Sequence, residues 1–389
     1  MAATAMAPVT RPVDSAVTRS FNFGSGMPDP ATFPSRELAE AAMRIVSRVG
    51  EVLVKYPDPK GWPELREIAV ERMRKNHGLY VPLDQVVLTN GSMQPIGLAG
   101  LSLAGAGATI VVESFTYVGT LNAFRRVGAD LVGVPLDDQG MRVDALAETL
   151  DRLIAEGRKP AFIYTIPSFQ NPTGTTLPLE RRRQLLEIAA AREVLIIEDD
   201  CYADVRFSDE APPPALYALG EPGRVIYIGS FSKILGPGIR LGYVIAPEPR
   251  MAELLRFKID GGISALSAMI VAEYFRDHLW SHIAECNQAL KAKRDTLLAA
   301  LEERLGPSGV EWTRPDGGLF TWLRLPEEID TARVRALATE AGIQYGTGRS
   351  FDAADQDIPY LRLAFGFIDR ADIPDGVAAL AGCIARAQR

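Results

Sequence analysis

The stretch VIYIGSFSKILGPGIRLG, residues 225–242, decides the fold of this chain. Its first four residues are apolar and favour a β-strand, and the polar loop that follows holds Lys233, one of eight lysines in the sequence. A lysine at the end of an apolar strand loses hydration, so its amine is more readily neutral and nucleophilic. The alternative is an ordinary turn in which this lysine is solvated.

The polar groups near Lys233 indicate what such an amine would react with. Ser230 and Ser232 supply hydroxyl donors, and Arg240 supplies a fixed cation after the Gly-Pro-Gly turn. Two hydroxyls and a guanidinium suit a phosphate dianion. The segment therefore predicts a site for an aldehyde that carries a phosphate, with Lys233 forming a Schiff base to it.

The composition is that of a globular enzyme. A chain of 389 residues exceeds one ordinary core, so a large and a smaller domain are expected. Hydrophobic residues make up 47% of the chain, charged residues 23%, and the formal net charge is −7. A negative net charge indicates no basic surface of the kind that binds nucleic acid, so no nucleic-acid partner is expected. No apolar run reaches the roughly 18 residues of a membrane span, so no membrane partner is expected either.

Cysteine usage predicts the compartment. The three cysteines, Cys201, Cys286 and Cys383, are odd in number and far apart. Such spacing disfavours a disulfide framework and fits a reducing environment. We therefore expect a cytoplasmic protein. The first twenty residues lack the apolar region of a secretion signal and are expected to form a loosely ordered arm.

Strands and helices alternate along most of the chain. Short, apolar strands are expected at residues 86–89, 109–113, 131–134, 161–165, 194–197, 225–228 and 242–246. This pattern predicts an α/β fold whose large domain has three layers, a mainly parallel sheet with helices on both faces. Ligands of such sheets gather at the carboxyl ends of the strands. Five chemically useful side chains directly follow a predicted strand: Ser92, Tyr117, Asn171, Asp199 and Lys233.

The pattern changes towards the C-terminus. A long polar helix is expected at residues 280–305, as a bridge between domains, and the shorter strands and helices after residue 310 predict a small α+β domain. The expected division is an N-terminal arm with part of the small domain in residues 1–54, a large cofactor-binding domain in residues 55–285 and a small C-terminal domain in residues 286–389.

A pyridine aldehyde needs further groups around its ring. Asp199 ends a buried strand, where a bare carboxylate is costly, and a protonated ring nitrogen would be its partner, although another ion pair would serve equally. Tyr202 and Asn171 can donate to the phenolic oxygen. Tyr117 can stack on the ring, although an aromatic residue at a helix start usually belongs to the core. Ser92 precedes a helix whose free N–H groups suit a phosphate, or a capped helix without a ligand.

Two further patterns leave alternatives open. Arg362 alternates with apolar residues on a predicted strand, so it is either a solvated outward residue or a bidentate clamp for a carboxylate. His278 and His282, with Glu285 nearby, have the spacing of metal ligands on a helix. No third ligand motif accompanies them, so a polar surface is favoured and no metal is expected.

Four separate motifs resemble those of the pyridoxal-phosphate-dependent aminotransferases of fold type I, class I/II. The chain looks closest to the subgroup of 2-aminoadipate and kynurenine aminotransferases, through the segments IPSFQNPTG, GSFSKILGPGIRLGY and TRPDGGLFTW. The resemblance covers roughly residues 21–385. The motifs are Asn171-Pro-Thr-Gly, Asp199-x-x-Tyr202, Ser230-x-Ser232-Lys233 with Arg240, and Arg362.

The resemblance implies pyridoxal 5′-phosphate as cofactor and a role for each matching residue. Lys233 would form the Schiff base, Asp199 would meet the ring nitrogen, and Tyr202 would complete the catalytic set. Arg362 would bind the substrate α-carboxylate, and the substrate contacts would be Gly26, Asn171 and Arg362. The cofactor contacts would be Ser92, Met93, Tyr117, Asn171, Asp199, Tyr202, Ser230, Ser232, Lys233, Arg240 and, across the interface of a homodimer, Tyr56.

The implied reaction is transfer of the amino group of an L-α-amino acid to a 2-oxo acid. A lyase or a β/γ-replacement enzyme on the same scaffold is the first alternative, and a ligand sensor without activity is the second. Residues 1–20 and the turn Tyr345-Gly346-Thr347-Gly348 depart from the subgroup pattern, which has a Val-Pro-Gly turn at the latter position. Both departures concern substrate choice, so the amino acid stays open.

Overall fold

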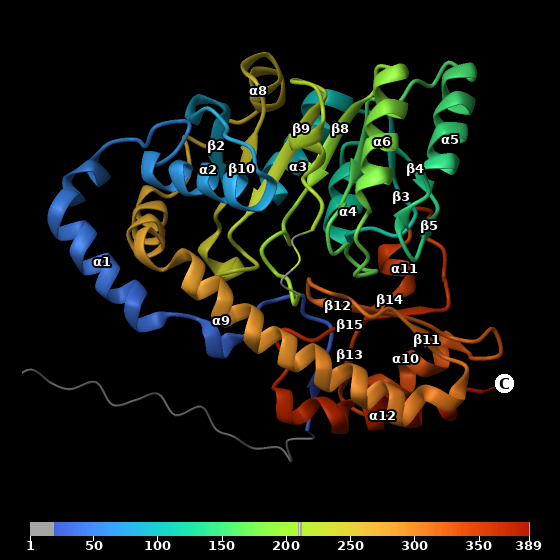
Figure 1. Cartoon of the computed structure of the whole chain (residues 1–389). Coiled ribbons are helices and arrows are strands. Elements are labelled where there is room, and N and C mark those ends of the chain that lie inside the picture. Colours follow the sequence, from blue (N-terminus) through green and yellow to red (C-terminus); the bar gives the residue numbers. More distant parts are fainter. Residues whose placement is uncertain (1–18, 209, 211, 389) are drawn as a thin grey trace, which may run out of the picture.

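The computed structural model describes residues 19–208, 210 and 212–388. Of the arm expected in residues 1–20, residues 1–18 lie outside the described part. Figure 1 shows a seven-stranded sheet with its helices in the upper half, a four-stranded sheet below it, and the long helix α9 (Ala265–Leu305) beneath both. Among the described helices, none combines the length and the hydropathy needed to cross a membrane.

The seven-stranded sheet carries the elements around residues 225–242. Its neighbouring strands run parallel, except that β10 is antiparallel to both of its neighbours. The prediction of an α/β fold with a mainly parallel sheet is therefore confirmed. In spatial order the strands are β2 (Val86–Thr89), β10 (Gly242–Ile245), β9 (Val225–Ser230), β8 (Leu195–Asp199), β7 (Phe162–Thr165), β3 (Thr109–Glu113) and β4 (Asp130–Val134).

Both faces of this sheet are buried, because alternate side chains along each strand enter different cores. On β7, Ile163 packs into the cluster formed with α5 and α6, whereas Phe162 and Tyr164 pack into the larger cluster on the other face. Three layers result. The helices of this part are α2 (Pro63–His77), α3 (Met93–Ala99), α4 (Val118–Arg126), α5 (Val143–Ala155), α6 (Leu179–Ala191), α7 (Leu216–Leu219) and α8 (Glu248–Leu255).

The second sheet is antiparallel and lies over α12 (Ile373–Ala385) and α9 in Figure 1. Its order is β11 (Glu311–Trp312), β12 (Phe320–Arg324), β15 (Tyr360–Ala364) and β14 (Gly346–Thr347), with α10 (Thr331–Glu340) and α11 (Gly348–Phe351) near it.

The start of the described chain belongs to this region. The strand β1 (Phe21–Asn22) pairs with β13 (Ile343–Gln344), and α1 (Ser35–Val49) packs against α9.

The predicted helix at residues 280–305 is wrong at its N-terminus, because α9 begins at Ala265. The hydroxyl of Ser264 caps it by accepting from the Ser267 amide. Residues 265–279 are mostly apolar and buried, so they lack the polar pattern on which the prediction rested. Since α9 runs without a break across residue 285, the expected domain division stays a prediction.

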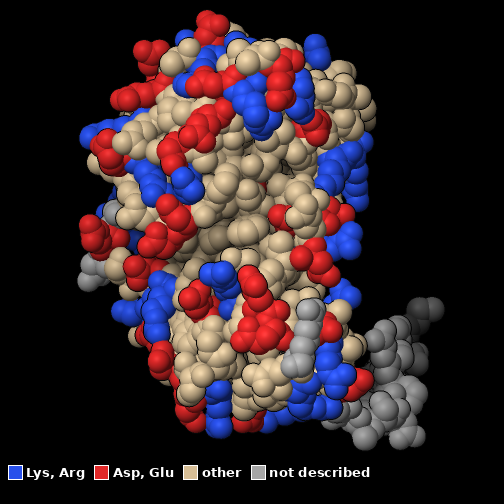
Figure 2. All heavy atoms as spheres, turned by 90° about the vertical axis from the view of Figure 1, so that its right-hand side faces the viewer, with Lys and Arg blue, Asp and Glu red and all other residues tan. Residues whose placement is uncertain are grey.

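A face with little charge runs between the two halves of the molecule. Figure 2 shows basic and acidic side chains interspersed above and below a mostly uncharged hollow on the side of α5. A cleft of about 310 Å³ between the sheets is lined by the aromatic side chains of Phe115, Trp312, Trp322 and Tyr360, among others. No single sign of charge dominates this face.

Candidate active site

The candidate site lies where β8 and β9 end. The two strands are parallel neighbours, with Asp199 opposite Ile228, so the side chains that follow both strands meet at one edge of the sheet. They enclose a cavity of about 100 Å³. Nine of the predicted cofactor residues line it: Ser92, Met93, Tyr117, Asp199, Tyr202, Ser230, Ser232, Lys233 and Arg240, together with Ile166, Cys201 and Pro237.

One end of the cavity is built for an anion. Arg240 has a left-handed backbone with φ of 58°, and its guanidinium donates to the Asn90 carbonyl at 2.7 Å. The backbone there is closely packed, since a Cβ at Gly91 would lie 2.9 Å from the Arg240 guanidinium and one at Gly242 would lie 2.7 Å from the Gly91 carbonyl carbon. The Ser230 hydroxyl accepts from the Ser232 amide at 3.0 Å. The hydroxyls of Ser230 and Ser232 and the Arg240 guanidinium line the same cavity, and such a set of donors fits a phosphate.

Lys233 lines the cavity and is the only lysine among the described residues that line it. Its Nζ donates to the Gly26 carbonyl at 2.8 Å and lies 5.6 Å from the centroid of the Tyr202 ring. Burial lowers the pKa of this amine, an effect that Arg362 reinforces and that Cys201 and Asp199 oppose. The amine is therefore more readily neutral than a solvated lysine, as nucleophilic attack on an aldehyde requires.

Asp199 is the last residue of β8 and lines the same cavity. Its Oδ2 accepts from the Tyr164 hydroxyl at 2.6 Å and its Oδ1 from the Cys201 thiol at 2.8 Å. Burial raises the pKa of the carboxyl, and the two donors and the Lys233 charge oppose that rise. A cation that entered the cavity would find in Asp199 a partner that is already oriented.

Arg362 is buried, so the alternative of a solvated outward residue is excluded. Its guanidinium lies 4.4 Å from the ring centroid of Phe320 and 4.7 Å from that of Phe351. One amino group donates to Asn171 Oδ1 at 3.1 Å and the other to the Gly24 carbonyl at 2.5 Å, while Nε has no hydrogen-bond partner in the described part of the chain. Among the described residues no carboxylate pairs with it, and burial lowers its pKa to about 10.

Asn171 joins the two ends of this arrangement. Besides accepting from Arg362, its side chain donates to the Tyr202 hydroxyl at 3.4 Å. Gly26 lies beside them, because a Cβ on it would be 2.9 Å from the Phe320 ring and 3.9 Å from an Arg362 amino group. The structure therefore brings together all the predicted site residues except Tyr56, which is 93% exposed.

Comparison with known proteins decides what this arrangement is. The family described as aminotransferase class I and II matches residues 18–380. The chain belongs to this family. It is 38% identical to aromatic-amino-acid aminotransferase 1 of Thermococcus litoralis, over 93% of this chain and 87% of that one. It is 34% identical to 2-aminoadipate transaminase of Thermus thermophilus, over 92% and 88% of the two chains.

Solved structures agree with the sequence comparisons. The α-aminoadipate aminotransferase LysN of Thermus thermophilus, in complex with N-(5′-phosphopyridoxyl)-L-leucine, has a TM-score of 0.88 at 33% identity and covers 95% of this chain and 92% of its own. Kynurenine aminotransferase of Pyrococcus horikoshii has a TM-score of 0.88 at 35% identity, with coverages of 95% and 92%. The predicted resemblance to fold type I aminotransferases is confirmed.

As a class I/II aminotransferase, the protein uses pyridoxal phosphate to transfer amino groups between an amino acid and a 2-oxo acid. The lyase alternative is not favoured by these relatives, and the protein is an enzyme. The site fits this cofactor, because the cavity offers hydroxyls with an arginine for a phosphate, an amine for an aldehyde and an oriented carboxylate for a ring nitrogen.

Sequence reasoning missed several residues of this aminotransferase site. Cys201 stands two residues after Asp199 and directly before Tyr202, so its position between two predicted residues could have identified it. The contact of Tyr164 depends on the pairing of β7 with β8, which sets Tyr164 opposite Ile197. Phe320 lies within the segment TRPDGGLFTW, but neither it nor Phe351 is close in sequence to Arg362, so no local pattern identifies them as the walls around this guanidinium.

The histidine pair of the metal alternative has another place in the structure. His282 is buried, with Nε2 at 2.6 Å from the Ile234 carbonyl and Nδ1 at 3.2 Å from the Tyr274 hydroxyl. The expectation that this helix face is a polar surface is therefore wrong for His282. It packs beneath the loop that carries Lys233.

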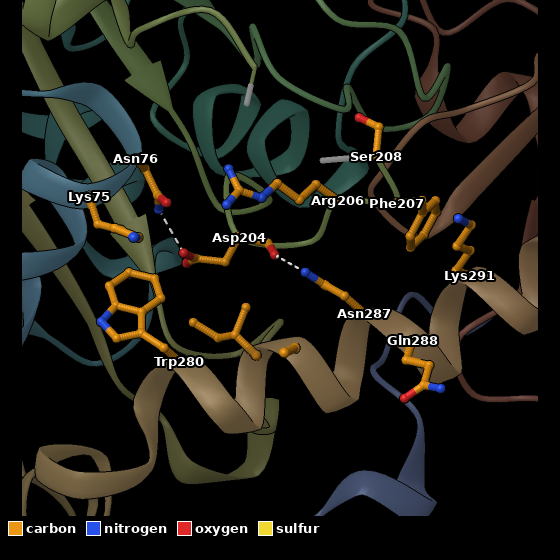
Figure 3. Close-up of a pocket in the computed structure, with 12 residues that line it drawn as sticks. Lys75, Asn76, Asp204, Arg206, Phe207, Ser208, Trp280, Asn287, Gln288 and Lys291 are labelled. Atoms are coloured by element: carbon orange, nitrogen blue, oxygen red, sulfur yellow. Dashed lines mark hydrogen bonds between the residues drawn. The ribbon is translucent and has the colours of Figure 1, made fainter. Parts of the chain in front are cut away.

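A larger cleft, of about 450 Å³, lies beyond the loop that follows Tyr202 (Figure 3). Figure 3 shows Asp204 at its centre, between Asn76 of α2 and Asn287 of α9. The Asp204 carboxylate accepts from Arg72 and from Asn76 at 2.6 Å, and its carbonyl accepts from Asn287 at 2.8 Å. These bonds attach the loop to α2 and α9 and thereby hold the catalytic residues at its start in place.

Proposed function

We propose that this aminotransferase holds pyridoxal phosphate in the cavity described above, with Lys233 as the Schiff-base lysine. Bound there, the cofactor supplies an aldehyde and a ring that withdraws electrons from the substrate Cα. The position of Lys233 supports the assignment, since it lines one cavity with Asp199 and Tyr202 and its amine lies 5.6 Å from the Tyr202 ring centroid. Released from the aldehyde by the substrate, the same amine moves the proton at the substrate Cα.

The remaining cofactor contacts follow from the chemistry of the side chains that line the cavity. Ser92, Met93, Ser230, Ser232 and Arg240 hold the phosphate. Asp199 pairs with the protonated ring nitrogen, and Tyr202 and Asn171 donate to the phenolic oxygen. Tyr117 stacks on the ring of the cofactor. Its side chain lines the cavity and is only partly buried, which supports this role over that of a core residue.

The burial of Arg362 is the observation that best supports binding of the substrate α-carboxylate at this site. A buried guanidinium without an anionic partner is costly, and its Nε is still free to donate. A substrate α-carboxylate would satisfy that donor and pair with the charge through a bidentate contact. Gly26, whose carbonyl accepts from Lys233, and Asn171, which accepts from Arg362, place the substrate between the two cations.

The assembly we propose is a homodimer in the cytoplasm, with Tyr56 reaching the phosphate of the neighbouring subunit. Tyr56, Val54 and Ile259 are apolar and 93%, 85% and 93% exposed. A Cβ on Gly261 would lie 3.9 Å from the Tyr56 ring, so the loop at 257–262 borders this tyrosine. In the same loop Asp260 accepts from Asn90 at 3.1 Å. The exposed apolar surface therefore adjoins the phosphate end of the cavity.

An absorbance cycle tests the proposed function. The purified protein is loaded with pyridoxal phosphate, and its visible absorbance band is followed while single amino acids are added. The panel includes phenylalanine, 2-aminoadipate and kynurenine, the substrates that the names of the relatives suggest. The band should fall with a substrate and return with a 2-oxo acid in wild type. Lys233→Ala should show neither change, and a normal cycle in that variant would refute the assignment.

A further inference from the structure

The carboxylate of Asp199 is held by two side chains that none of the motifs includes. The Tyr164 hydroxyl donates to Oδ2 at 2.6 Å and the Cys201 thiol donates to Oδ1 at 2.8 Å. Tyr164 in turn accepts from the Thr120 hydroxyl at 3.0 Å. Each carboxylate oxygen therefore keeps a lone pair that is free to face the cavity.

Neither Tyr164 nor Cys201 loses its proton to the Asp199 carboxylate, so both remain hydrogen-bond donors. Burial, with the nearby Asp199 charge, raises the pKa of the Tyr164 hydroxyl and of the Cys201 thiol well above the usual values. Both groups therefore keep their protons, and Asp199 must accept both bonds. A carboxylate that receives two such bonds is stabilised in its ionised form, even though burial favours the neutral one.

Two separate elements supply these donors. Tyr164 comes from the middle of β7, and Cys201 comes two residues after the end of β8, on the loop that Asp204 anchors. Cys201 also lines the cofactor cavity itself, whereas Tyr164 approaches Asp199 from the core. The two bonds thus fix the carboxylate from two directions, so rotation about its terminal torsion would break both.

We propose that Cys201 and Tyr164 are positioning residues, which keep Asp199 ionised and aim its oxygens at the ring nitrogen of the cofactor. The inference rests on the proposed function, since it assumes that the cofactor ring lies against Asp199. The thiol contributes a donor without adding a charge, and it sits beside both Asp199 and Tyr202. Its bond is the weaker of the two, because an S–H group is a weaker donor than a phenol.

The test compares two cofactors in the full-length protein after removal of its cofactor. One is pyridoxal phosphate, and the other is its analogue with carbon in place of the ring nitrogen. Equilibrium dialysis gives the dissociation constant of each for wild type, Cys201→Ala, Cys201→Ser and Tyr164→Phe. We expect Cys201→Ala and Tyr164→Phe to weaken binding of pyridoxal phosphate by about tenfold, as for the loss of one bond to a charged group.

The carbon analogue separates positioning from packing. It offers Asp199 no ring N–H, so the same two variants should bind it as wild type does. Cys201→Ser keeps a donor at the γ position of the side chain and should restore the affinity for pyridoxal phosphate. Equal losses for both cofactors, or a serine variant that behaves like the alanine variant, would show that Cys201 only fills space.

Matched controls come from other parts of the chain. Cys383→Ala removes a buried thiol of α12, and Tyr345→Phe removes a buried hydroxyl that has no hydrogen-bond partner among the described residues. Both controls should bind the two cofactors as wild type does. If wild type itself failed to bind pyridoxal phosphate, the proposed function would fail. If wild type bound it and all variants matched wild type, only the positioning role would fail.

Discussion

At the scale of single residues, the most informative side chain is Arg362. Its guanidinium is enclosed by Phe320 and Phe351 and bonded to Asn171 and to the Gly24 carbonyl, all of them uncharged partners. Burial without an anion lowers its pKa to about 10. A substrate carboxylate would remove this penalty on binding. We therefore expect binding of the α-carboxylate to depend on the charge of Arg362.

The corresponding prediction concerns Arg362→Lys. An ammonium keeps the charge but cannot make the bidentate contact, so kcat/KM should fall by about 10- to 100-fold, the effect of losing bonds to a charged group. The loss should be similar for every α-amino acid and small for simple amines, which lack the carboxylate. Steady-state kinetics with both substrate classes measures this. A loss confined to acidic amino acids would instead assign Arg362 to the side chain.

At the scale of elements, the site depends on a loop that hydrogen bonds attach to two helices, α2 and α9. The loop after β8 carries Tyr202, and three residues of α2 and α9 hold its Asp204: Arg72, Asn76 and Asn287 (Figure 3). Arg72 and Asp204 are both buried, and the guanidinium of Arg72 also lies 5.0 Å from the Phe231 ring centroid. Arg72 thereby also contacts Phe231, which directly follows β9 and lies two residues before Lys233.

We predict that Asp204→Asn lowers the free energy of unfolding by about 3–5 kcal/mol, because Arg72 is left as an uncompensated buried charge. Urea denaturation monitored by circular dichroism measures the change. The control is Asp151→Asn, which removes the partner of Arg192 in a pair with an exposed carboxylate. That loss should stay below about 1 kcal/mol. Equal effects in the two variants would contradict the role given to the buried pair.

The elements also show how far the sequence predicts this site. Strand ends could be read from short apolar runs followed by polar groups, and this placed Ser92, Asp199 and Lys233 together. The start of α9 could not be read in this way, because residues 265–279 are mostly apolar and lack the polar pattern of the rest of the helix. Contacts such as Tyr164 with Asp199 depend on the register between strands, which periodicity within one strand does not determine.

At the scale of the whole molecule, the proposed homodimer would complete the site, since one of its predicted residues lies outside the cavity of its own chain. Tyr56 matches a cofactor residue but lies on the surface, together with Val54 and Ile259. Exposed apolar side chains gathered near a functional cavity indicate an interaction surface. A second copy of the chain placed there would bury these residues and bring a tyrosine to the phosphate end of each cavity.

The dimer predicts a specific response to Ile259→Asp. A carboxylate buried in an apolar interface is costly, so sedimentation velocity should show a shift from dimer to monomer, with a parallel loss of activity. Ile154→Asp serves as the control, since Ile154 is 39% exposed on α5, which lies on the opposite side of Figure 1 from α1. That variant should remain a dimer. A wild-type protein that is active as a monomer would remove the proposed assembly.

The central claim is that Lys233 carries the cofactor, and covalent trapping tests it most directly. The protein loaded with pyridoxal phosphate is reduced with borohydride and digested, and mass spectrometry locates the phosphopyridoxyl group among the eight lysines. The account predicts one modified site, Lys233, and no modification in Lys233→Ala treated in the same way. A phosphopyridoxyl group on another lysine, with Lys233 unmodified, would contradict it.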